Sequence, residues 1–132
     1  MQLYTHALKA LAVGVFAVAF VHILLGVSAE PLLGSGISEI SQADPSLDSQ
    51  NRFYGAAFSL FGGLWWLSSC DVAKYQKVLK LSFLIFFLAG ASRLVSIGML
   101  GLPSIPIIAL TGVELIGPPL MFLWLNKVLP NA

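Results

Sequence analysis

Hydrophobic residues gather in four long runs that alternate with polar segments along the chain. The runs cover residues 7–29, 53–70, 78–100 and 105–126. Each is close to the roughly 17–25 residues that a helix needs to cross the hydrocarbon layer of a membrane. The pattern therefore predicts an all-α integral membrane protein, a single bundle of four transmembrane helices.

Turn and helix-breaking residues separate the runs. The long connection over residues 30–52 holds the turn signal Gly34-Ser35-Gly36 and two prolines. Residues 36–43 are suited to a short surface helix that ends before Pro45. The uncharged turn 101–106 is so short that the third and fourth runs should form an antiparallel hairpin.

Composition supports a membrane protein. Hydrophobic residues make up 58% of the chain and charged residues 10%, whereas a soluble domain has about 25% charged residues. The net charge of +1 indicates neither a nucleic-acid partner nor an acidic one. The single Cys70 excludes a disulfide within the chain and a multi-cysteine metal site.

The start of the chain has two interpretations. Lys9, the apolar run and Val27-Ser28-Ala29 together resemble a signal peptide with its cleavage site. The run is longer than the roughly 7–15 apolar residues of a typical signal peptide. We therefore interpret residues 7–29 as a retained transmembrane helix.

Basic residues predict the orientation in the membrane. The link 71–80 carries Lys74, Lys77 and Lys80, and short loops rich in lysine stay in the cytoplasm. This orientation also places Lys9 and Lys127 inside and the acidic connection 30–52 outside. An aromatic belt then lies at the inner interface, formed by Trp65, Trp66, Tyr75 and Trp124. We expect both termini in the cytoplasm and a multi-pass protein of the bacterial inner membrane.

Arg93 and Glu114 are the charges deepest inside apolar runs. Burying a charge in the hydrocarbon layer costs several kcal/mol, so such residues usually face the protein interior and pair. Because they lie on adjacent runs joined by a tight turn, we expect Arg93 and Glu114 to form one buried ion pair. Pro118 and Pro119 leave the carbonyls of Glu114 and Leu115 without helical donors, and an arginine has donors to spare for them.

Three further polar residues fall in the same outer half of the predicted bundle. They are His22 in the first run and Arg52 and Tyr54 at the start of the second. With Arg93 and Glu114 they form a candidate ligand-binding site, a polar pocket that opens outward above an apolar floor. The structural alternative makes Arg93–Glu114 a pair that fixes helix register, His22 a core histidine and Arg52 an interface residue.

Short motifs add a resemblance to a known family. They are Asn51-Arg52-Phe53-Tyr54-Gly55, then Gly90-Ala91-Ser92-Arg93-Leu94-Val95-Ser96 with Gly101-Leu102-Pro103, and Glu114 followed by prolines. Together they resemble the bacterial four-span membrane proteins catalogued as domain of unknown function 4345. The resemblance covers most of the chain, most clearly from the second run to the end. It implies a four-helix inner-membrane protein, marks Arg52, Tyr54, Gly55, Arg93 and Glu114 as pattern positions, and implies no particular activity.

The sequence favours a binding protein over an enzyme. We expect it to hold a membrane lipid, another amphipathic molecule or a partner membrane subunit, or to form a homo-oligomer. The alternative is a small proton-coupled exporter that uses Glu114. An enzyme or electron carrier ranks third, because one membrane histidine cannot supply both axial ligands of a haem and no metal-ligand spacing occurs. We expect no cofactor, no metal and no nucleic-acid partner.

Overall fold

A computed structural model describes residues 1–129, and every regular element in this range is a helix. The elements are α1 (Gln2–Leu25), the 3₁₀ turns η1 (Gly26–Ala29) and η2 (Pro31–Leu33), α2 (Glu39–Gln42), α3 (Pro45–Cys70), α4 (Gln76–Leu100) and α5 (Ile105–Val128). The prediction of an all-α protein is confirmed.

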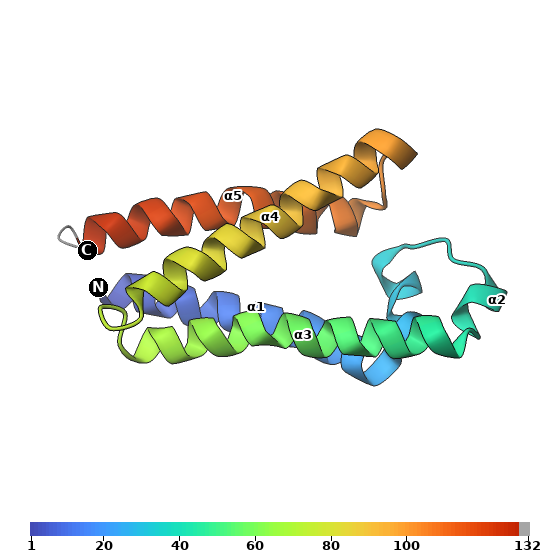
Figure 1. The fold of residues 1–132 in the computed structure, drawn as a ribbon, viewed down its shortest axis with the longest axis horizontal. Coiled ribbons are helices and arrows are strands. Elements are labelled where there is room, and N and C mark those ends of the chain that lie inside the picture. The colour runs from blue at the N-terminus through green and yellow to red at the C-terminus, as the bar shows by residue number, and fades with distance from the viewer. Residues whose placement is uncertain (130–132) are drawn as a thin grey trace.

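The four long helices form two antiparallel hairpins (Figure 1). In one hairpin α1 packs against α3, and in the other α4 packs against α5. The chain begins at the same end of the molecule at which α5 finishes, and we call this the termini end. The opposite end, which we call the loop end, carries residues 26–44 and the α4–α5 turn.

Three helical segments are long and apolar enough to cross a membrane. They are Gln2–Ala29, Gln76–Leu100 and Ile105–Val128. The remaining long helix, α3, is less hydrophobic because its first eight residues are mostly polar and it carries several glycines and serines. The molecule is thus a helical protein suited to a membrane.

Helix boundaries follow from local chemistry and differ in places from those expected. α3 begins at Pro45 rather than Phe53, since the Asp44 carboxylate caps it by accepting from the backbone N–H of Ser46 and Leu47. Pro45 occupies the first turn of α3, where its missing N–H does no harm. The short surface helix expected over residues 36–43 is present as α2.

The hydrophobic core lies toward the termini end, where all four long helices meet. Five aromatic rings join α3 to α4 there, with centroids 5.0–6.1 Å apart: Phe58, Phe61, Trp65, Phe83 and Phe86. Beyond this aromatic cluster α4 moves away from α3 toward the loop end (Figure 1). Consequently no residue between 91 and 110 is buried.

Candidate functional site

Arg93 on α4 and Glu114 on α5 form the expected ion pair. Arg93 Nε donates to Glu114 Oε2 at 2.6 Å, and Nη2 donates to Oε1 at 3.1 Å. Both glutamate oxygens therefore accept from one side of the guanidinium. The prediction that these residues pair is confirmed, and in residues 1–129 the Arg93 hydrogen bonds go to the carboxylate rather than to a freed carbonyl.

The two partners differ in burial. The side chain of Glu114 is 4% exposed, whereas that of Arg93 is 38% exposed. Arg93 Nη1 forms no hydrogen bond with any residue from 1 to 129. The end of the guanidinium formed by Nη1 and Nη2 thus faces outward with donors to spare.

Gly90 brings the two helices close enough for this pair. A Cβ at Gly90 would lie 2.8 Å from Glu114 Cβ and 3.2 Å from Leu115 Cγ. Only a glycine allows such close helix contact, as at small-residue interfaces of membrane helices generally. Gly90 lies less than one turn before Arg93, so the glycine and the arginine meet the same stretch of α5.

Arg93 follows the inward-facing stripe of α4. Phe86 and Gly90 are buried on this stripe, and Arg93 lies seven and three residues further on, a spacing that keeps one helix face. The aromatic cluster ends about 10 Å before Arg93, at about 1.5 Å of rise per residue. Arg93 consequently lies beyond the aromatic cluster, toward the loop end of α4.

His22 belongs to a separate polar group at the loop end. Its Nδ1 donates to the carbonyl of Val18 at 2.9 Å, and its Nε2 lies 3.9 Å from Glu30 Oε1. Asn51 Nδ2 donates to the same Glu30 oxygen at 2.9 Å. This group links α1, α3 and the turn between η1 and η2.

Arg52 donates hydrogen bonds to the last backbone carbonyls of α1. Its Nη1 donates to the carbonyls of Ile23 and Leu24 at 2.7 and 2.8 Å, and its Nε donates to Asp48 Oδ2 at 2.7 Å. Asp48 Oδ1 in turn accepts from the backbone N–H of Val27 at 3.1 Å. The last carbonyls of a helix lack intrahelical donors, and here α3 supplies them.

The hydrogen bonds at Asp48 also set its ionisation. The bond from Arg52, followed by the one from the Val27 amide, holds the pKa of the Asp48 carboxyl below its usual range. Asp48 is therefore ionised at neutral pH, as its role in joining α1 to α3 requires.

Tyr54 is 62% exposed, and its ring packs edge-to-face on Phe53. It lines a cavity of about 220 Å³ between α3 and the loop, together with Glu30 and Asn51. All five predicted site residues thus lie toward the loop end, but in two groups. No hydrogen bond or ion pair within residues 1–129 joins Arg93 or Glu114 to His22, Arg52 or Tyr54.

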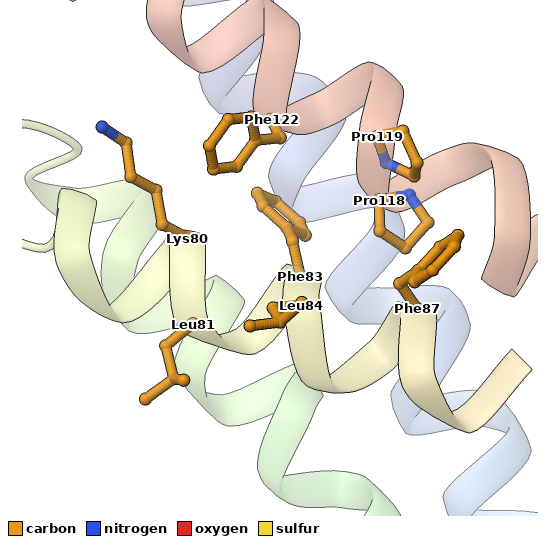
Figure 2. A pocket seen from close by; sticks show the side chains of 8 residues that line it. All are labelled: Lys80, Leu81, Phe83, Leu84, Phe87, Pro118, Pro119 and Phe122. Atoms are coloured by element: carbon orange, nitrogen blue, oxygen red, sulfur yellow. The ribbon is translucent and has the colours of Figure 1, made fainter. Parts of the chain in front are cut away.

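A larger apolar groove of about 590 Å³ lies between α4 and α5, nearer the termini end (Figure 2). Phe83 and Phe122 face one another beside Lys80, and Phe87 lies near Pro118 and Pro119 at the other end of the groove. None of the five predicted site residues lines it. Its position depends on how α4 crosses α5, which the sequence alone does not reveal.

Two acidic residues important at the loop end were missed by sequence reasoning. Asp48 precedes Arg52 by four residues, the spacing of an ion pair on one helix face. That signal was available but required α3 to begin before residue 48. Glu30 gave no such signal, because its partners His22 and Asn51 are distant in sequence. Among residues 1–129, no three His, Cys, Asp or Glu side chains are placed to hold a metal ion.

Comparison with known proteins identifies the family. The family model described as domain of unknown function (DUF4345) matches residues 3–125. The chain belongs to this family, which confirms the resemblance seen in its motifs. No curated protein and no solved structure matches the chain.

Proposed function

We propose that the chain is a four-span protein of a bacterial inner membrane that binds the acidic head group of an amphipathic molecule through Arg93. The head group is a carboxylate or a phosphate, whose paired oxygens match the fork of a guanidinium group. The apolar part of the molecule extends from Arg93 toward the aromatic cluster.

The proposal is supported by the guanidinium of Arg93, of which only one side donates to Glu114. One side is occupied by Glu114, while Nη1 has no partner within residues 1–129 and the side chain is 38% exposed. Donors left unpaired in an apolar environment are costly, by several kcal/mol for a group in lipid. An oxoanion that accepts from Nη1 and Nη2 removes that cost.

Glu114 sets how strongly the site holds an anion. The Arg93–Glu114 pair is neutral overall, so an added anion meets the guanidinium and the carboxylate together. At a separation of about 7 Å and an effective dielectric constant of about 20, the two anions repel by about 2 kcal/mol. Such a site favours reversible binding over permanent retention.

The properties of α3 support a fourth span, and the positions of the lysines support the orientation. The apolar part of α3, residues 53–70, is about 27 Å long at about 1.5 Å per residue, close to a hydrocarbon layer of about 30 Å. It also packs along α1, a helix that is itself long and apolar enough to span. All five lysines lie toward the termini end: Lys9, Lys74, Lys77, Lys80 and Lys127. Because short lysine-rich segments stay in the cytoplasm, this distribution supports an orientation with both termini inside.

Native mass spectrometry of the gently solubilised protein tests the proposal. The wild type should retain an acidic amphipath, and the doubly neutral variant Arg93→Gln/Glu114→Gln should lose it, because no guanidinium remains. The double change leaves no unpaired buried charge, so folding should survive. Equal retention by both proteins would refute binding at Arg93. A retained membrane protein in place of a lipid would show that Arg93 serves a partner subunit.

The exporter hypothesis takes second place. Both Glu114 oxygens accept from Arg93, and a cycle of protonation would have to break this pair. Proton or organic-cation movement in vesicles containing the wild type, and its loss in Glu114→Gln, would reverse this order.

A further inference from the structure

The cavity at the loop end has the chemistry of a cation site. We call it the loop pocket; its walls include Val27, Glu30, Ile37, Leu47, Asn51 and Tyr54. Its volume of about 220 Å³ matches about seven water molecules at about 30 Å³ each. It therefore suits a small molecule or a single head group rather than a long chain.

Glu30 is the one charged residue lining the loop pocket. Its side chain is 29% exposed, and Oε1 is fixed by the bond from Asn51. Oε2 accepts no hydrogen bond from residues 1–129. A fixed, partly buried carboxylate with an open oxygen attracts a cation more strongly than a mobile surface one.

The other oxygen of this carboxylate faces the interior of the loop end. His22 Nε2 lies 3.9 Å from Glu30 Oε1, the same oxygen that accepts from Asn51. His22 is not among the residues that line the loop pocket. Oε2 is therefore the carboxylate oxygen left for a ligand.

The surroundings are also negative. Residues 26–51 contain four acidic residues and no lysine or arginine. Asp48 is neutralised by Arg52, which leaves Glu30, Glu39 and Asp44 without a cationic side chain from this segment. The local charge thus favours a cation over an anion.

We propose that the loop pocket binds the primary ammonium group of a small organic amine. The ammonium donates to Glu30 Oε2, while the carbon chain packs on Val27, Ile37 and Leu47. A divalent metal ion fits less well, since Ca²⁺ requires about 6–8 oxygen ligands and the walls hold one carboxylate. The proposal does not depend on anion binding at Arg93, which lies in the other group of residues.

Calorimetry with ethanolamine as the probe tests this site in the full chain in neutral detergent. Glu30→Gln keeps the shape and the acceptor for Asn51 but removes the charge, so affinity for ethanolamine should fall at least tenfold. Glu39→Gln is the matched control, because it makes the same charge change on an exposed side chain of the same loop. Its affinity should stay within twofold of the wild type.

A second variant separates binding from folding. Ile37→Trp fills the loop pocket without touching Glu30, and it should also abolish ethanolamine binding. Absence of binding by the wild type, or equal weakening by Glu30→Gln and Glu39→Gln, would overturn the proposal. Equal affinity for tetramethylammonium, which has no N–H donor, or preference for Mg²⁺, would overturn the assignment to a primary ammonium group.

Discussion

Replacing Gly90 with alanine should force α4 and α5 apart at the ion pair. The new Cβ would lie 2.8 Å from Glu114 Cβ, whereas carbon atoms in contact are about 3.5–4.0 Å apart. The helices must therefore separate by about 0.7–1.2 Å at this level. A shift of that size stretches the Nη2–Oε1 bond, now 3.1 Å, beyond hydrogen-bonding distance.

Overpacking of this kind typically costs about 1–3 kcal/mol. Gly98→Ala is the matched control, since it lies on the same helix and a Cβ there would meet nothing within 4 Å. Alanine is favoured over glycine inside a helix by about 1 kcal/mol. This gain applies to both variants and cancels between them, so Gly90→Ala should be about 1–3 kcal/mol less stable than Gly98→Ala.

The free energy of unfolding can be measured for both variants in mixed micelles, by titration with a denaturing detergent and far-ultraviolet circular dichroism. Gly90→Ala should unfold at a lower detergent fraction than Gly98→Ala, and Gly98→Ala at the same fraction as the wild type or a higher one. If Gly90→Ala is as stable as Gly98→Ala, the close contact at Gly90 does not hold the pair together.

Three further predictions concern other parts of the molecule. The hydrogen bonds that lower the pKa of Asp48 stabilise the loop end above the unfolded pKa of about 3.9, and this stabilisation is lost as the pH falls through the folded value. Acid titration should therefore melt the wild type at the α1–α3 junction, and Asp48→Asn should flatten this dependence of stability on pH. Tyr4→Phe should leave stability unchanged or raise it, because the buried Tyr4 hydroxyl has no partner within residues 1–129, and thermal melting would detect a loss. Exposed Cys70 lies at the termini end, so a membrane-impermeant maleimide should label it in inverted vesicles and not in spheroplasts; the reverse pattern would invert the proposed orientation.

The ion pair could be predicted from sequence because an unpaired charge is costly in the hydrocarbon layer of a membrane. A lone arginine or glutamate in an apolar helix has few acceptable surroundings, and Arg93 and Glu114 lie on consecutive runs. The same reasoning does not predict the hydrogen-bond partners of a charged residue at the membrane interface, such as Arg52. Arg52 bonds to Asp48 and to the end of α1, and both depend on how residues 26–44 fold back.

Hydropathy was also an incomplete guide to the elements. α3 extends about two turns before the apolar run that begins at residue 53. These turns are mostly polar, and the helix starts at Pro45 because Asp44 caps it. The groove between α4 and α5 and the loop pocket arise from crossing and folding back, so neither leaves a pattern in the sequence. The shapes between elements were therefore outside prediction, whereas the four long helices and the Arg93–Glu114 pair could be predicted.

Anion binding at Arg93 is tested most directly by the affinity for dodecyl phosphate of the wild type, Glu114→Gln and Arg93→Gln/Glu114→Gln. Isothermal titration in a neutral detergent gives all three values, with dodecanoate as a second probe for a carboxylate head. Removing the Glu114 charge removes up to about 2 kcal/mol of repulsion, so Glu114→Gln should bind more tightly than the wild type. The double variant should not bind. Equal or weaker binding by Glu114→Gln, or binding that survives in the double variant, would contradict a head-group site on the open side of Arg93.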